Sequence, residues 1–168
     1  MVPLAAVLLT LAAQAGPCRA VLCTAAEVEA VYVRGWEAAQ AAARVGGSRE
    51  SLAPVREAIA TLERMAAGAH GPAEIARYVL TAAADAAQDE RDEMAIFIEH
   101  AVTLERMQLD AHQPGAPAIT AHEAAGDLWL QVHRYEDAQR AYEHAKSVIG
   151  STPRIESGLA RVADAQRR

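Results

Sequence analysis

The chain of 168 residues is a series of segments with a helical hydrophobic period, separated by short breaks. Apolar residues recur about every three to four positions, and the strict alternation of a half-buried strand is missing. An acidic cluster at 89–93 is expected to form a solvated corner between two helices. The pattern predicts seven helices, over residues 24–44, 51–68, 72–88, 94–109, 120–132, 135–149 and 153–168.

Two of these helices begin with the sequence of a capping box. Thr24 is followed three residues later by Glu27, and Thr120 is followed by Glu123. In this motif the hydroxyl and the carboxylate satisfy backbone amides that a helix start leaves free. At the other end of the first helix, the glycines at 46–47 favour the left-handed conformation that ends a helix.

An internal repeat links three of the predicted helices. Residues 57–65 match residues 99–107, and both segments end in the identical sequence Thr-Leu-Glu-Arg-Met. A weaker third copy covers residues 143–148, 44 residues after the second. Each copy falls on the second helix of an expected pair. The repeat therefore predicts stacked helix pairs, each of which buries its apolar stripe against its neighbours.

The clearest repeat, residues 126–153, resembles a tetratricopeptide (TPR) repeat, a helix-turn-helix unit of about 34 residues. The residues that carry this resemblance are Gly126, Trp129, Tyr135, Ala138, Tyr142 and Ala145. The resemblance implies an all-α fold, a right-handed superhelix of about three antiparallel helix pairs followed by a C-terminal helix. The three aromatic residues are then interpreted as core.

The segment departs from the TPR pattern at several positions. His133 replaces the glycine usual at the turn, His122 replaces an early tryptophan, and Gly150 stands where a proline usually closes the repeat. Ala160 follows Gly126 by one period of 34 residues, and is expected to be the small contact residue of the next helix. The two upstream pairs match the family only loosely.

The resemblance also implies a binding surface, because TPR proteins bind peptides on the concave face formed by their first helices. A groove of mixed charge suits an extended segment of another protein. The alternative is that these side chains are merely solvated. Carried over by position, the groove residues are Glu123, Asp127, Leu130 and Gln131, with Arg154 and Arg161 from the last helix.

Composition supports closely packed helices. The chain contains 41 alanines, and 52 % of it is apolar although only 4 % is aromatic. Alanine favours helices and adds little bulk, whereas sheets need β-branched and aromatic residues. The formal charge of −6 argues against nucleic acid or anionic lipid as a partner, since both require a basic face.

The first residues have the pattern of an export signal. Residues 2–13 are an apolar run too short to span a bilayer, and Ala13-Gln14-Ala15 provides the small-x-small sequence of a cleavage site. Cleavage after Ala15 would make the protein periplasmic or secreted, in the envelope of a bacterium. No lysine or arginine precedes the run, so a buried N-terminal helix remains the alternative. The predicted parts are a signal peptide at 1–15, a short segment at 16–23, and a helical repeat domain at 24–168.

The only cysteines, Cys18 and Cys23, lie in that short segment. In an oxidising compartment they could form a disulfide, and the other interpretation is two unpaired thiols. A lipoprotein or N-terminal anchor is less favoured. Pro17 and Leu22, which precede the two cysteines, are not the small residues that a lipid-attachment motif requires.

No sequence motif indicates catalysis, a cofactor or a metal site. His122-Glu123 begins like a zinc-protease motif, but Gly126 stands where the second histidine is needed. His100 and His144 occupy equivalent positions in two repeats, without an evident third ligand. We therefore expect a non-enzymatic protein-interaction module with no metal site and no cofactor, and with no membrane span in the mature chain. The alternative function is a small helical carrier of a ligand or metal in the periplasm that uses the histidines.

Overall fold

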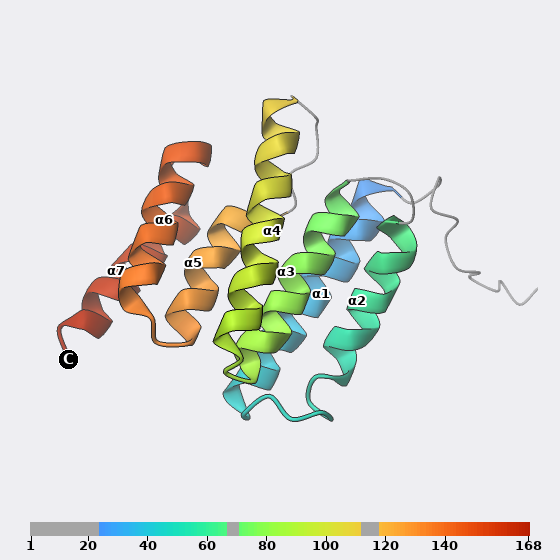
Figure 1. Cartoon of the computed structure of the whole chain (residues 1–168), viewed down its shortest axis with the longest axis horizontal. Helices are drawn as coiled ribbons and strands as arrows, with labels where there is room; N and C mark the ends of the chain where they lie inside the picture. Colours follow the sequence, from blue (N-terminus) through green and yellow to red (C-terminus); the bar gives the residue numbers. More distant parts are fainter. Residues whose placement is uncertain (1–23, 67–70, 112–117) are drawn as a thin grey trace, which may run out of the picture.

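The computed structural model describes residues 24–66, 71–111 and 118–168, and every regular element in these ranges is a helix (Figure 1). The predicted all-α class is confirmed. The proposed signal peptide, Cys18 and Cys23 lie outside the described residues. The helices are α1 (Ala25–Arg44), α2 (Ala53–Ala66), α3 (Pro72–Ala87), α4 (Arg91–Asp110), α5 (Ala121–Gln131), α6 (Tyr135–Ile149) and α7 (Pro153–Gln166).

Both predicted capping boxes are present. The Thr24 hydroxyl accepts the backbone N–H of Glu27 at 3.3 Å, and the Thr24 backbone N–H donates to the Glu27 carboxylate at 2.8 Å. Thr120 and Glu123 exchange the same two hydrogen bonds, at 3.1 and 3.2 Å. These local signals fix the first residue of α1 and of α5.

The helices α1, α3 and α5 end in the same way. Gly46, Asp89 and His133 have positive φ angles of 85°, 60° and 60°. In each case the next backbone N–H bonds to the carbonyl five residues earlier, at 2.9–3.0 Å, which is the Schellman motif. The three turns are 43 and 44 residues apart, close to the spacing of the sequence repeat.

The acidic corner is shorter than predicted. Helix α4 begins at Arg91, so that Asp92 and Glu93 belong to its first turn. Carboxylates are favoured at this end of a helix because the first backbone N–H groups carry partial positive charge. Asp89 alone makes the left-handed turn, and its carboxylate pairs with Arg91 at 2.8 Å.

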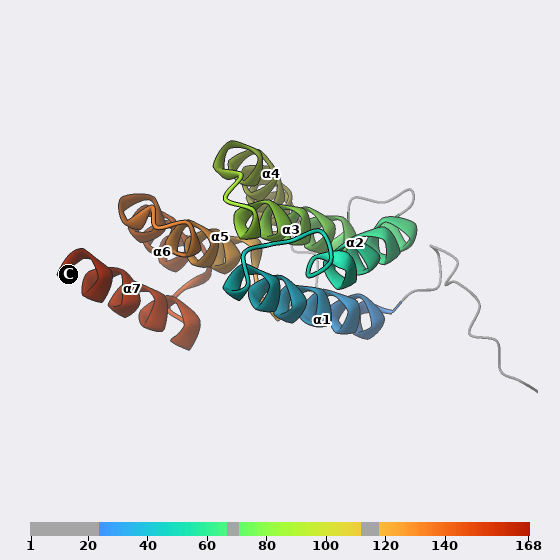
Figure 2. The ribbon, with the colours of Figure 1, turned by 90° about the horizontal axis from the view of Figure 1, so that it is seen from below.

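Contacts between helices follow chain order. Each of the first helices contacts the next one, as α1–α3, α3–α5 and α5–α7, and each second helix contacts the first helix that follows it. In the view of Figure 2, α1 and α7 lie on the same side of α3 and α5. None of the helices in the described ranges is long and apolar enough to cross a membrane.

Alanine fills the centre of this arrangement. Helix α3 packs against α1, α2, α4 and α5, and it buries seven alanines together with Ile75, Val79 and Leu80. Close approach is also visible at Gly35 of α1, where an added Cβ would lie 2.3 Å from a methyl group of Leu80. The expected link between alanine content and close helix packing is confirmed in α3.

Tyr142 of α6 fills the space between α5 and α7. An added Cβ on Gly126 would lie 2.4 Å from its ring, and one on Gly158 would lie 2.2 Å away. Gly158 therefore provides the small contact surface that was predicted at Ala160, and Ala160 is exposed. The prediction for Ala160 was wrong because the residues facing the Tyr142 ring are 32 apart rather than 34.

The identical sequence Thr-Leu-Glu-Arg-Met has two different environments. In α2, Leu62 is fully buried and Glu63 is exposed. In α4, Leu104 is half-buried and Glu105 is only 2 % exposed. The second copy thus presents its glutamate to the interior where the first presents its leucine.

Candidate functional site

Three of the six predicted groove residues, Asp127, Arg154 and Arg161, belong to one polar network between α5 and α7. Asp127 of α5 is its centre. One carboxylate oxygen of Asp127 accepts from Arg154 at 2.7 Å, and the other accepts from Arg161 at 2.6 Å. Each oxygen thus has its own guanidinium partner, a charge-assisted arrangement that also joins the two helices.

Tyr142 completes the network from α6. Its hydroxyl donates to Asp127 at 2.5 Å and accepts from Arg161 at 3.2 Å. Burial, together with the Asp127 carboxylate, raises the pKa of Tyr142, so the phenol remains a donor. Sequence reasoning interpreted Tyr142 as core only. The ring is core, but the hydroxyl belongs to the site.

Glu123 lies beside this network and is buried. One of its oxygens takes part in the capping box with Thr120, and the other accepts the Thr152 hydroxyl at 2.5 Å. Thr152 caps α7 through a 3.2 Å bond from the N–H of Ile155. Glu123 therefore connects the start of α5 to the start of α7.

The remaining two predicted groove residues have other contacts. Leu130 is half-buried and packs against the cluster formed by α6 and α7. The Gln131 side-chain oxygen accepts from Gln40 of α1 at 3.1 Å. Leu130 thus contributes mainly to packing, whereas Gln131 lies where α1 meets α5.

Helix α1 contributes aromatic residues that the sequence did not assign to the site. The Arg154 guanidinium lies 5.4 Å from the centre of the Trp36 ring, a cation–π contact. The Tyr32 hydroxyl donates to the carbonyl of Ile119 at 3.0 Å, just before α5. Their only sequence signal was an aromatic pair at helical spacing, which is as typical of a core as of a binding surface.

A cavity of about 670 Å³ opens next to this network, at the end of α4 and α6 and the start of α7. Its polar lining includes Glu123, Thr152 and Arg154, and its apolar lining includes Leu109 and Val148. Leu109 and Val148 are 38 % and 37 % exposed. A depression with apolar walls and a few polar groups is typical of a binding site.

His100 and His144, which were compared in the sequence as equivalent positions, each contact a different ring. The rings of His122 and His144 lie 5.5 Å apart, whereas His100 packs against the ring of Tyr78 at 4.4 Å. His122 is bonded to Glu105 through a 2.5 Å contact at its Nδ1 atom. In the described part of the chain, no three His, Cys, Asp or Glu side chains are grouped so as to hold a metal ion.

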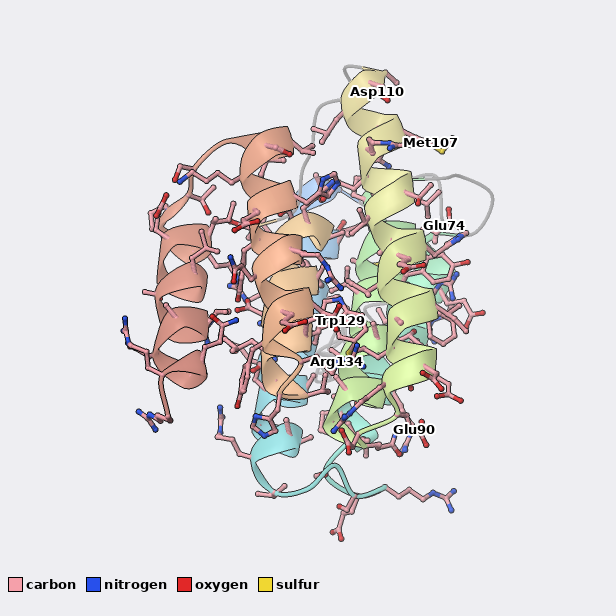
Figure 3. All side chains as sticks on the ribbon, turned by 60° about the vertical axis from the view of Figure 1, so that its left-hand side comes forward. Glu74, Glu90, Met107, Asp110, Trp129 and Arg134 are labelled. Carbon is pink, nitrogen blue, oxygen red and sulfur yellow. The ribbon has the colours of Figure 1, made fainter. Side chains whose placement is uncertain are left out.

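The far end of α5 is occupied by Trp129 and Arg134, which lie close together in Figure 3. The guanidinium of Arg134 is 5.7 Å from the centre of the Trp129 ring. Trp129 is half-buried and contacts both hydrophobic clusters of the protein. The prediction that its ring belongs to the core is confirmed in part.

Comparison with known proteins did not identify a relative. No family model, no curated protein and no solved structure matches the chain.

Proposed function

We propose that the protein is a non-enzymatic interaction module of stacked, TPR-like helix pairs that binds an extended segment of a partner protein. The binding surface is the Asp127 network (Asp127, Tyr142, Arg154 and Arg161) with the adjoining cavity lined by Glu123 and Arg154. We place this activity outside the cytoplasm of a bacterium, in keeping with the signal-like residues 1–15.

The helix contacts support the repeat part of this proposal. Every helix contacts its neighbours in chain order, and the three helix pairs share the same Schellman turn at intervals of 43 and 44 residues. Repeat proteins bury a continuous core through such contacts between neighbours. The right-handed superhelix remains part of the proposal.

One observation carries the functional part: the predicted groove residues come together from helices far apart in sequence. Asp127 and Arg161 are 34 residues apart and form a 2.6 Å ion pair. Arg161 is still 55 % exposed in this pair, so its outer N–H groups remain accessible. These N–H groups can donate to a carboxylate or a backbone carbonyl of the partner segment.

The test is a crosslinked pull-down from the native compartment with the whole chain as bait. Arg161→Glu reverses the exposed charge of the site, and Arg140→Glu on α6 is the matched control. Arg140 is 72 % exposed and also pairs with a carboxylate, that of Asp137. Thermal unfolding measured by circular dichroism must show that both variants fold.

We expect the wild type and Arg140→Glu to recover the same partner in similar amounts. Arginine is a frequent hot spot of interfaces, and losing one such contact costs about 1–2 kcal/mol, or roughly five- to thirtyfold in affinity. Arg161→Glu should therefore reduce recovery by about tenfold. Equal recovery with both variants, or no specific partner with the wild type, would contradict the proposal.

A further inference from the structure

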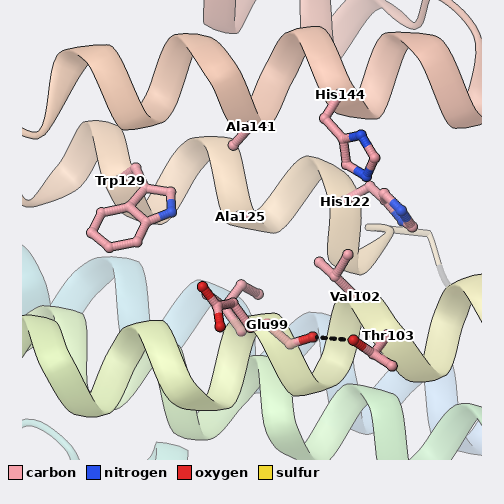
Figure 4. Close-up of a pocket in the computed structure, with 9 residues that line it drawn as sticks. Glu99, Val102, Thr103, His122, Ala125, Trp129, Ala141 and His144 are labelled. Atoms are coloured by element: carbon pink, nitrogen blue, oxygen red, sulfur yellow. Dashed lines mark hydrogen bonds between the residues drawn. The ribbon is translucent and has the colours of Figure 1, made fainter.

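A second cavity lies between α4, α5 and α6, separate from the Asp127 network (Figure 4). Its volume of about 330 Å³ is at the lower end of the range of small-molecule sites. Ile98 and Val102 of α4 and Ala125 of α5 give it apolar walls. Trp129 lies at one end, and the rings of His122 and His144 lie at the other.

The buried carboxylate of Glu105 holds His122 in place. Glu105 accepts the backbone N–H groups of Ala121 and His122 at 3.0 and 3.1 Å, and it contacts Nδ1 of His122 at 2.5 Å. A carboxylate accepts hydrogen bonds only, so Nδ1 of His122 is the donor in this contact, and in the singly protonated tautomer Nε2 carries no proton. The other ring nitrogen, Nε2, is then an acceptor.

Nε2 of His122 has no hydrogen-bond partner in the described structure, and the side chain is 0 % exposed. A buried polar atom without a partner costs about 1–3 kcal/mol, and such atoms are rare in folded proteins. His122 is among the residues that line the cavity, so a bound molecule whose hydrogen-bond donor reaches Nε2 would remove this cost.

The charges around the cavity restrict the kind of molecule. Glu99 lines the cavity, and Glu105 lies directly behind His122. Two carboxylates at one small site disfavour an anion such as a fatty acid. The apolar walls and the indole ring of Trp129 favour a neutral, largely hydrocarbon body.

We propose that this cavity binds a small neutral alcohol or phenol, whose hydroxyl donates to Nε2 of His122 while its apolar body packs beside Trp129. The same sequence motif in α2 leaves Glu63 exposed. The buried Glu105–His122 pair is thus specific to the interface that contains the cavity.

The probe pair is phenol and toluene, which have similar size but differ in the hydroxyl donor. Binding to the full chain is followed by the indole N–H signal of Trp129 in ¹H–¹⁵N spectra. A single hydrogen bond contributes about 1 kcal/mol, so phenol should bind about fivefold more tightly than toluene. Benzoate, an anion of similar shape, should bind more weakly than phenol.

His122→Asn is the discriminating variant, because the asparagine amide can still donate to Glu105 while nothing replaces Nε2. It should lower phenol affinity to that of toluene and leave toluene affinity unchanged. His100→Asn is the control, since His100 contacts Tyr78 outside the cavity. It should leave both affinities unchanged.

Ala141→Leu keeps the test decisive if His122→Asn fails to fold, because the larger side chain occupies the cavity and should abolish binding of both probes. The proposal is overturned if phenol does not shift the Trp129 signal saturably. It is also overturned if phenol and toluene bind the wild type equally, or if Ala141→Leu binds both as the wild type does.

Discussion

The two copies of Thr-Leu-Glu-Arg-Met allow a matched test of how the tertiary fold changes the contribution of one glutamate side chain to stability. Glu105→Gln removes the charge of the buried glutamate, and Glu63→Gln makes the same change at the exposed one. Both substitutions are nearly isosteric and both lie within the same five-residue sequence. A difference in stability between the two variants must therefore come from the tertiary environment of the glutamate.

The structure allows the cost of Glu105→Gln to be worked out. Glu105 accepts three N–H groups, two of them from the first residues of α5. Glutamine has only one acceptor oxygen, so at least one buried donor loses its partner, at about 1–3 kcal/mol. Losing a negative charge at a helix N-terminus adds about 0.3–1 kcal/mol. The expected loss is about 1–4 kcal/mol, against less than ~0.5 kcal/mol for Glu63→Gln.

Urea unfolding of the full chain, followed by far-ultraviolet circular dichroism, measures both effects. The midpoint should fall clearly for Glu105→Gln at an unchanged slope, and it should stay close to that of the wild type for Glu63→Gln. The reasoning would be refuted if both variants unfolded at the same midpoint, since Glu105 would then not be a buried partner of α5.

Three further substitutions test other parts of the fold by the same unfolding measurement. Burial and two nearby glutamates raise the pKa of the half-buried Asp85 from 3.8 to about 6. The charged form is thus disfavoured in the folded state, and stability contributed by the protonated form is lost as pH rises from about 4 to 6. Asp85→Asn should stabilise the protein by about 1 kcal/mol at pH 7, a value reduced for solvent screening, and should give no gain in stability at pH 3.5. A gain in stability that does not depend on pH would contradict the raised pKa as its cause. Gly158→Ala should lower the free energy of unfolding by about 1–3 kcal/mol, because the new methyl group overlaps the Tyr142 ring. Ser157→Ala on the exposed surface should change it little. Equal losses for the two variants would argue against this packing. His133→Gly should stabilise the protein by about 0.5–1 kcal/mol, because glycine adopts the positive φ of 60° without steric cost. A loss of stability would show that the contacts of the histidine side chain outweigh the backbone effect.

Features set by local chemistry were predicted well. The capping boxes at Thr24 and Thr120 depend on residues only three positions apart, and the helices begin where these pairs predict. The glycines at 46 and 47 both have positive φ angles, as a helix-ending pair should. Asp89 makes an equivalent turn without glycine. The acidic cluster predicted a corner at 89–93, but it did not indicate which residue makes the turn.

Features set by packing between helices were predicted less well. The two residues on each side of Glu63 and Glu105 are identical, so the immediate sequence did not distinguish the exposed glutamate from the buried one. The difference arises because α5 places two backbone N–H groups next to α4. The small residue that contacts Tyr142 is Gly158 and not the predicted Ala160 for the same reason, since this contact depends on how α7 lies against α6.

The candidate site was predicted in part. The resemblance to TPR repeats led to Asp127, Arg154 and Arg161, which the structure brings together. It did not indicate that these charges pair with one another, or that Trp36 of α1 contacts Arg154. Helix periodicity identifies side chains on one face of a helix, but it gives no distance between helices far apart in sequence.

The proposed partner site can be tested most directly by photo-crosslinking in the native compartment. A lysine analogue with a diazirine group is placed at position 161, beside Asp127, and in a second protein at position 140 on α6. Both positions carry exposed arginines in the wild type. We predict that position 161 yields a discrete adduct with one partner protein, mapped by mass spectrometry to a single extended segment, and that position 140 does not. The same adducts from both positions, or none from position 161, would contradict the proposal that this face binds a partner.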